Sequence, residues 1–281
     1  MVILCILFAI ALLLAGLWLL ALRCKKKEGD FFGLTDYHYA HRGLHNSRAG
    51  VPENSLLAFR KAVSNGYGAE LDVHLSKDGR LVVIHDESLL RTAGVDRNVA
   101  DCTASELREY FLEETGEPIP FLEEVLPIFA GKAPLVIELK AFRRNHAALA
   151  DATCRMLDRF PQLQYCIESF DPRVLLWLKK HRPQVIRGQL SCNFVKDRSG
   201  LKAVTAVLMT NLLFNFLTVP HFIAYRFTDR SALSLQVCRK LWGVQEFSWT
   251  IPSQRRADKV LKEGAAIIFE GFCPGKDQNY V

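Results

Sequence analysis

Residues 134–169 read PLVIELKAFRRNHAALADATCRMLDRFPQLQYCIES and contain a strand, a helix and a second strand in succession. β-Branched and other apolar residues fill 134–139, a helical pattern follows over 146–159, and a second β-rich run occupies 165–169. Two β-rich runs on either side of a helix are typical of parallel strands joined by a crossover helix. This stretch therefore predicts a parallel α/β fold.

The same alternation continues on both sides of this unit, and no Pro-, Gly- or Ser-rich linker interrupts it from residue 37 onward. The predicted strands are 38–41, 69–73, 134–139, 165–169, 185–190, 222–225, 244–249 and 266–269. The predicted helices are 55–64, 146–159, 172–181, 200–217, 231–241 and 254–263, with few helical signals over 100–127. Eight strands over this length match a closed (β/α)₈ TIM barrel of about 250 residues. An open doubly wound sheet is the alternative, but no GxGxxG follows the first strand.

Residues 70–86, ELDVHLSKDGRLVVIHD, depart from simple alternation. Two β-rich runs flank Asp78-Gly79, which is a strong hairpin signal. Paired positions then sum to about 157, so Asp72 is expected opposite about residue 85. We expect a small antiparallel hairpin inserted after the second barrel strand, which returns His85 beside Asp72 at the mouth of the barrel.

Residues 2–22 carry no charged side chain, and as a helix they reach about 30 Å, enough to span a bilayer. We expect one transmembrane anchor over 1–23, a basic juxtamembrane linker over 24–36 and a barrel domain over 37–281. A cleaved signal is the alternative, but it usually has cations before the apolar run. The cations that follow the run favour a single-pass protein of the cell membrane with its catalytic domain in the cytoplasm. They are Arg23, Lys25, Lys26 and Lys27.

The formal net charge is +6, and residues 23–28 supply four cations against one anion. The remaining excess is too dilute for nucleic-acid binding, which requires a dense basic patch. The cysteines beyond the linker show no CxxC or metal-ligand spacing, which indicates reduced thiols. The apolar run 201–217 is expected to form a helix packed on the barrel, with a shallow contact to the membrane as the alternative.

Charged residues gather where the predicted strands end, which is where TIM barrels build their active sites. They are His41, Arg42, Glu70, Asp72, His85, Glu138 and Lys140. Glu70 and Asp72 are two positions apart on one strand, so their side chains share a face. Buried acids on one face repel each other unless a cation lies between them, and carboxylate oxygens suit Mg²⁺ or Ca²⁺ better than zinc. Simple salt bridges to Arg42 or Lys140 are the alternative, and the same two cations could bind a phosphate.

These residues lie in motifs that resemble those of the glycerophosphodiester phosphodiesterase family. The motifs, in chain order, are His41-Arg42-Gly43, Pro52-Glu53-Asn54-Ser55, Glu70-Leu71-Asp72-Val73, His85-Asp86 with Arg91-Thr92, Glu138-Leu139-Lys140 and Trp249-Thr250. The ordered set covers about residues 37–274, nearly all of the chain after the apolar run. The resemblance implies a TIM barrel, a divalent cation, and hydrolysis of a glycerophosphodiester to glycerol 3-phosphate and an alcohol.

The resemblance also implies a role for each matching residue. The implied metal ligands are Glu70, Asp72 and Glu138, with Glu53 in or near the metal shell. His41 and His85 are the implied acid/base pair, and Arg42 and Lys140 bind the phosphate. Trp249 covers the glycerol or the leaving group, although packing inside the barrel would explain it almost as well.

Two other functions fit the sequence. The apolar N-terminus and the 201–217 run suit a lysophospholipase D-like enzyme that cleaves membrane lysophospholipids at the same metal site. An inactive barrel kept as a membrane interaction module would be expected to lack some of the site residues, and all of them are present.

Overall fold

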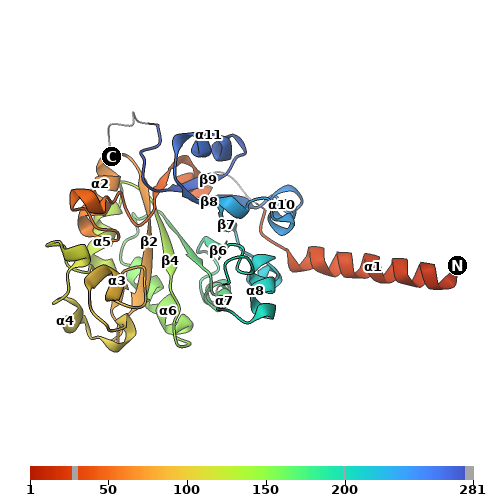
Figure 1. The fold of residues 1–281 in the computed structure, drawn as a ribbon, viewed down its shortest axis with the longest axis horizontal. Coiled ribbons are helices and arrows are strands. Elements are labelled where there is room, and N and C mark those ends of the chain that lie inside the picture. Colours follow the sequence, from red (N-terminus) through yellow and green to blue (C-terminus); the bar gives the residue numbers. More distant parts are fainter. Residues whose placement is uncertain (27–30, 199, 276–281) are drawn as a thin grey trace.

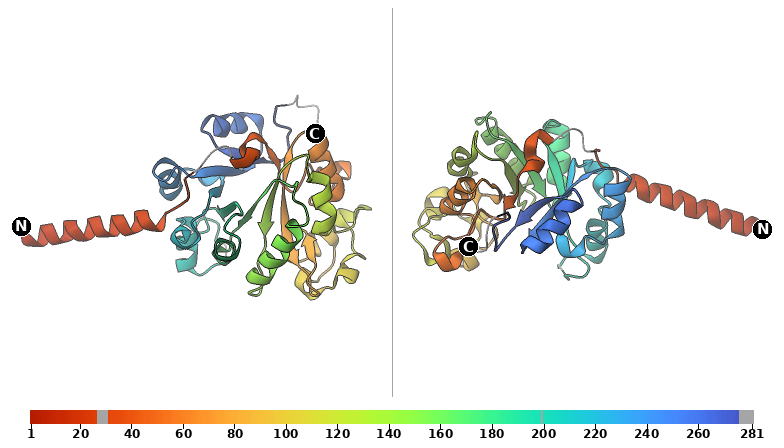
Figure 2. Two further views of the ribbon diagram at one scale, coloured as in Figure 1. Left: turned by 180° about the vertical axis from the view of Figure 1, so that it is seen from behind. Right: turned by 90° about the horizontal axis from the view of Figure 1, so that it is seen from above.

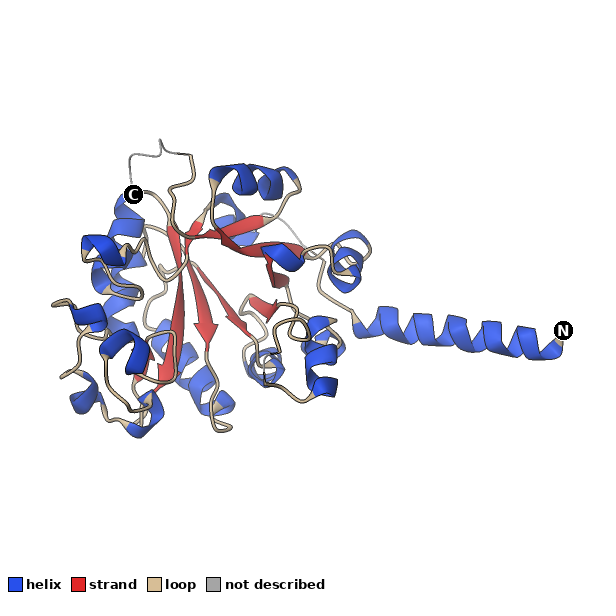
Figure 3. Cartoon of the chain, viewed as in Figure 1, coloured by secondary structure: helices blue, strands red, loops and turns tan. Residues whose placement is uncertain are grey.

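The computed structural model describes residues 1–26, 31–198 and 200–275 (Figure 1). Eight parallel strands close into a barrel, because β1 pairs with β2 on one side and with β9 on the other. The barrel strands are β1 (Tyr39–Ala40), β2 (Gly68–Leu75), β4 (Leu135–Leu139), β5 (Tyr165–Ser169), β6 (Arg187–Ser191), β7 (Phe222–Arg226), β8 (Gln245–Ile251) and β9 (Ala266–Phe269). Figure 3 shows them enclosed by helices. The predicted (β/α)₈ fold is confirmed.

The predicted hairpin is also present as an antiparallel extension of β2 by β3 (Leu81–Val83). Val73 pairs with Val83 and Leu75 with Leu81, so paired numbers sum to 156, one less than expected. The backbone N–H of Ile84 donates to the carbonyl of Asp72 at 3.1 Å. His85 therefore follows directly after the residue opposite Asp72, close to its predicted place.

Helices and short 3₁₀ turns surround the barrel (Figure 2). The helices after the N-terminal one are α2 (Leu56–Ser64), α3 (Leu90–Ala93), α4 (Ala104–Leu107), α5 (Leu122–Phe129), α6 (His146–Leu157), α7 (Pro172–His181), α8 (Ala203–Thr210), α9 (Asn215–Thr218), α10 (Leu233–Lys240) and α11 (Gln254–Lys262). The 3₁₀ turns are η1 (Phe31–Asp36), η2 (Ser47–Ala49), η3 (Val99–Asp101), η4 (Leu112–Glu114) and η5 (Phe227–Asp229). Side-chain caps explain two of the starts: Ser55 accepts from the N–H of Ala58, and Asp171 caps α7, which begins at a proline.

Two helix predictions need correction. Helix α5 begins inside the stretch 100–127 predicted to be poor in helix and runs past its end. Leu122, Val125, Leu126 and Phe129 form a buried face at helical spacing despite Pro127. The single helix predicted over 200–217 is two shorter helices, α8 and α9. Between them Leu212 adopts a φ of 58°, which no helix continues.

Two apolar layers hold the barrel together. Inside the barrel, large side chains from β1, β7 and β8 fill the end opposite the carboxyl ends of the strands. Tyr39 and Phe222 each pack on Phe247 there. Gly188 makes room for this packing, because a Cβ there would lie 2.1 Å from the ring of Phe222. Outside it, a larger cluster joins strands to helices α2, α5, α6, α7 and α11. This rigid framework positions the residues at the strand ends.

The N-terminal helix α1 (Val2–Ala21) projects from the barrel (Figure 1). It has a mean hydropathy of 3.0 and buries none of its span in the protein, so its length and composition suffice to cross a membrane, as those of a signal sequence also do. Leu22, directly after it, is buried against the barrel together with Leu235 and Cys238. None of the eight cysteines, all of which are described, forms a disulfide bond. Two predicted segments lie partly outside the described residues. These parts are Lys27 and residues 28–30 of the linker, and residues 276–281 of the barrel domain.

Candidate active site

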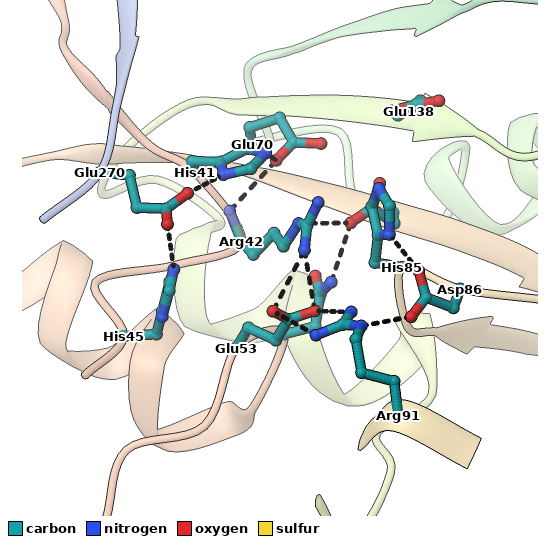
Figure 4. Close-up of polar contacts among 12 residues, drawn as sticks. His41, Arg42, His45, Glu53, Glu70, His85, Asp86, Arg91, Glu138 and Glu270 are labelled. Carbon is teal, nitrogen blue, oxygen red and sulfur yellow. Dashed lines mark hydrogen bonds and ion pairs between the residues drawn. The ribbon is translucent and has the colours of Figure 1, made fainter. Parts of the chain in front are cut away.

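A cavity of about 360 Å³ opens at the carboxyl ends of the barrel strands. It is lined by seven of the predicted site residues: His41, Arg42, Glu70, His85, Glu138, Lys140 and Trp249. The lining also includes the apolar side chains of Phe170, Leu190 and Ile268 and the charged residues Asp197 and Arg226. The strand-end argument thus brings residues from five strands or strand ends into one site, as Figure 4 shows in part.

Three carboxylates form a compact buried group at this site. Glu70 and Asp72 come from β2 and Glu138 from β4, where Asp72 and Glu138 are paired in register. One oxygen from each lies within 4.8 Å of the others, and all three residues are at most 5% exposed. Burial and mutual repulsion raise the pKa of Glu70 well above its ordinary value, and burial raises the pKa of Glu138 to about 7.

Two protein cations contact this group. The Lys140 Nζ lies 3.0 Å from Asp72 and 2.8 Å from Glu138. The backbone N–H of Arg42 donates to Glu70 at 3.1 Å, and its side chain lies 3.7 Å from Asp72. Although burial alone would raise the pKa of Asp72, Lys140, His85 and Arg42 bring it below its ordinary value. The salt bridges that were the alternative to a metal site therefore exist.

These salt bridges do not fully neutralise the negative charge of the three acids. The pKa of Asp72 lies below its ordinary value, but that of Glu70 remains well above its own. A group of three buried oxygen donors with incomplete charge compensation is what a hard divalent cation requires. The donor set thus fits a divalent metal. Among the described residues, it is the one cluster of acids, histidines or cysteines whose ligand atoms lie close enough together to hold an ion.

The two predicted histidines are held in the same way from different elements. His41 Nδ1 lies 2.5 Å from Glu270, and His85 Nδ1 lies 2.6 Å from Asp86. A carboxylate at Nδ1 accepts its proton, so the neutral ring keeps Nε2 free to accept another. Burial lowers the pKa of His85, which favours its neutral form. Both rings border the cavity, so each can exchange a proton with a molecule bound there.

Glu53 lies beside the three-acid group rather than within it. Its carboxylate accepts from Arg42 at 3.0 and 3.1 Å and from Arg91 at 2.6 and 3.1 Å. Arg91 also donates to Asp86, which in turn holds His85. Figure 4 shows this chain of charges from Glu53 to His85. Its place in or near a metal shell stays a prediction, and its observed contacts orient two guanidinium groups.

Trp249 stands at the end of β8 with its ring edge-on to Phe170, 5.9 Å between centroids. The side chain is partly exposed and lines the cavity rather than filling the barrel interior, although it also touches the inner cluster. Its indole N–H has no hydrogen-bond partner among the described residues. Trp249 therefore offers a flat apolar surface to a bound molecule.

The structure adds two acids that the sequence reasoning missed. Glu270 directly follows β9, so the strand-end rule that selected His41 would have found it. Glu168 lies on β5 in register with Glu138, is buried, and leaves one oxygen without a hydrogen bond. Burial raises the pKa of Glu168 well above its ordinary value. Its place inside the apolar run 165–169 was the available signal.

Comparison with known proteins agrees with this geometry. The sequence profile of the glycerophosphoryl diester phosphodiesterase family matches residues 41–265. The chain belongs to this family. As a glycerophosphodiester phosphodiesterase it is a phosphoric diester hydrolase, and the resemblance read from the motifs is confirmed.

Three similar proteins illustrate the membership. A glycerophosphodiester phosphodiesterase of Caldanaerobacter subterraneus subsp. tengcongensis is 31% identical over 235 residues, covering 80% of this chain and 89% of the relative. A phosphodiesterase of Oleispira antarctica, solved with its product sn-glycerol-3-phosphate, has the same fold at a TM-score of 0.68 and 23% identity, covering 85% of this chain and 94% of that one. A lysophospholipase D of Rattus norvegicus is 36% identical over 116 residues, 37% of this chain and 36% of the relative.

Proposed function

We propose that this phosphodiesterase hydrolyses glycerophosphodiesters to glycerol 3-phosphate and an alcohol. The observation that carries the proposal is that two histidines, each held by a carboxylate at Nδ1, border the same cavity as Glu70 and Glu138 of the three-acid group. The activity of the Caldanaerobacter relative and the product held by the Oleispira enzyme support the same substrate class.

Glu70, Asp72 and Glu138 hold a divalent cation in this proposal, either Mg²⁺ or Ca²⁺. Glu53 supports the shell from its edge through Arg42. When bound, the cation neutralises charge on the phosphate oxygens and polarises the phosphorus centre. Lys140 and Arg42, which contact the acids in this structure, are placed to turn toward the phosphate. Arg42 offers a planar fork of donors and Lys140 a point charge.

The two histidines move the protons. The glycerol hydroxyl next to the ester is the nucleophile: one histidine accepts its proton at Nε2 as the new P–O bond forms. The other histidine protonates the oxygen of the leaving alcohol as that P–O bond breaks. Water then opens the cyclic phosphate with the two roles reversed, which yields glycerol 3-phosphate. Trp249 covers the substrate from the β8 side.

A coupled assay for glycerol 3-phosphate tests the function over a panel of head groups such as choline, ethanolamine and glycerol. We expect release from at least one of them, complete loss with a chelator, and recovery when Mg²⁺ or Ca²⁺ is added back. Release that persists in the chelator would contradict the metal site. Absence of release from every head group would contradict the substrate class.

Lysophospholipase D-like activity is the second candidate, and the apolar cavity wall favours it. Phe170, Leu190 and Ile268 add apolar surface to the cavity lining, which suits a substrate that carries an acyl chain. The rat lysophospholipase D is similar over part of the chain. Comparing glycerophosphocholine with lysophosphatidylcholine under matched conditions separates the two activities.

We also propose that α1 is a retained membrane anchor, with domain limits of 1–23, 24–36 and 37–281 and with the barrel in the cytoplasm. The support is its uncharged 20-residue span and the cations Arg23, Lys25 and Lys26 that follow it. Leu22 is buried in the barrel's side. Burial of the residue directly after the helix supports a retained anchor over a cleaved leader.

A further inference from the structure

The helices beside the base of α1 carry exposed apolar side chains. Helices α8 and α10 lie on either side of the base of α1 in Figures 1 and 2, and α9 contacts α1. The exposed side chains of these helices and their ends are Val204, Val207, Phe216, Leu217, Leu233 and Leu241, at 38–72% exposure. We call these six residues the anchor-side face.

The anchor-side face is joined to α1 without a free linker. Leu22 and Cys24 are buried in one cluster with Leu212 of the α8–α9 turn and Leu235 of α10. The backbone N–H of Lys25 donates to the carbonyl of Pro220, just after α9, at 2.9 Å. Since α1 ends at Ala21, the chain packs on the barrel from the first residue after the membrane span.

The charge around the face suits an anionic lipid surface. Residues 197–246 contain six cations and three anions. Three of its arginines are paired with acids. Lys202 and Lys240 are exposed and form no ion pair among the described residues. Apolar side chains with free lysines beside them are typical of surfaces that bind lipid headgroups.

The segment between β6 and α8 also lines the active-site cavity. Cys192 and Asp197, which line the cavity, follow β6 and lead into α8. The Ser191 hydroxyl donates to the carbonyl of Met209, and the N–H of Phe194 donates to Thr210 at 3.0 Å. These bonds tie the cavity wall to α8, so the position of the anchor-side face sets the position of the cavity.

We propose that the anchor-side face contacts the lipid headgroups of the bilayer that α1 spans. This contact gives the cavity access to phosphodiesters that carry an acyl chain in that bilayer. The proposal rests on the anchoring and the phosphodiesterase activity proposed above. The bilayer is the occupant because the membrane span leaves the barrel through this face. A protein partner would have to displace lipid that the span itself brings there.

Lipid contact is tested on the full chain in vesicles of phosphatidylcholine and phosphatidylglycerol. Cys5 is the exposed one of the eight cysteines, so fluorophores are attached at Val204→Cys, Leu241→Cys or Phe111→Cys in a Cys5→Ser background. Phe111 is 49% exposed and precedes η4, on the side of the barrel remote from α1. We expect nitroxide-labelled lipids to quench the probes at 204 and 241 and to leave the probe at 111 bright. Equal emission at the three sites would overturn the proposal.

An activity arm tests access. In the double variant Val204→Glu/Leu241→Glu, turnover of lysophosphatidylcholine in vesicles should fall about tenfold, while turnover of soluble glycerophosphocholine is retained. The control Phe111→Glu should retain both. Equal loss of the two activities, or retention of both, would overturn the access that we propose. Quenching at 204 and 241 in a protein that cleaves neither substrate would contradict the proposed function and uphold the membrane contact.

Discussion

His41 and Glu270 lie 2.5 Å apart at the first and last strands of the barrel, although 229 residues separate them in the chain. Parallel pairing of β1 with β9, in which Ala40 faces Phe269, brings the residue after each strand to the same edge. Glu270 also lies 4.0 Å from His45 and keeps its own pKa at about 2, chiefly through its hydrogen bond to His41. Closure of the barrel therefore orients one of the two proposed proton carriers.

Replacing Glu270 by Gln should lower kcat with little change in KM. The amide presents no negative charge to Nδ1, so the ring loses both its orientation and the support for its charged form. We expect a loss within the about 10²–10⁴-fold that general acid–base catalysis contributes. Glu270→Asp, which keeps the carboxylate, should recover part of kcat. A Gln variant with the kcat and pH profile of the parent would refute this positioning role.

His41→Ala and His85→Ala should each remain folded and lose turnover by about 10²–10⁴-fold. The reason is that each removes one of the two rings that border the cavity. Turnover of glycerophosphocholine and the thermal midpoint measure the two effects separately. His146→Ala, at the start of α6, is the matched control and should keep its turnover. Normal turnover in both site variants would end the acid–base assignment.

Adding Mg²⁺ or Ca²⁺ to chelator-treated protein should raise the thermal midpoint, because an ion that binds only the folded state stabilises it. Glu138→Gln should weaken this response by removing one oxygen donor of the three-acid group. Glu168→Gln is the control, because Glu168 lies outside the three-acid group and burial, by raising its pKa, already disfavours its charged form. Equal metal response in the Glu138 and Glu168 variants would contradict the predicted ligand set.

His221 should make the fold less stable in mild acid. Burial, with help from Arg187 and Lys25, lowers its pKa from 6.5 to about 4, and its Nδ1 accepts from the N–H of Arg187 at 3.3 Å. Between these two values the unfolded chain binds the proton and the folded chain does not, so stability falls as the pH drops from 6.5 toward 4. His221→Gln should lose less stability over this range in urea titrations. Parallel curves for the parent and the variant would contradict the assignment.

A reporter fused to the C-terminus tests the orientation of the anchor. We expect activity from a reporter that works only in the cytoplasm and none from one that works only outside the cell, because Arg23, Lys25 and Lys26 hold that flank inside. Deleting residues 1–18 should release the protein from membranes while Leu22 remains to fill its place in the barrel's side. The opposite reporter pattern would place the active site outside the cell.

Much of the fold follows from local patterns that a sequence displays directly. The strands 165–169 and 266–269 and the helix 172–181 have the predicted bounds, because their apolar periodicity agrees with their burial. Asp78-Gly79 specified the hairpin, since few other dipeptides suit such a turn. Errors occurred where tertiary packing outweighed local signals, as when Leu212 broke the helix predicted over 200–217.

The three-acid group was also predictable, because alternation along β2 and the strand-end rule place acids without any knowledge of distances. The partners of these residues were not. Glu53 is predicted to lie in or near the metal shell, and the sequence did not indicate that its carboxylate also holds Arg42 and Arg91. Such pairs depend on how loops fold over the mouth of the barrel, and side-chain contacts between loops leave no periodic signal in a sequence.

By itself the sequence determined the barrel, the apolar span and the kinds of residue at the strand ends, since all three depend on composition and spacing along one chain. Only the tertiary structure decided which carboxylate holds which histidine, as in His41 with Glu270 and His85 with Asp86. It also placed helices α8, α9 and α10 around the base of α1, with Leu235 of α10 in one cluster with Leu22. These relations arise when the barrel closes and brings distant segments together, because hydrogen bonds and surfaces form between neighbours in space.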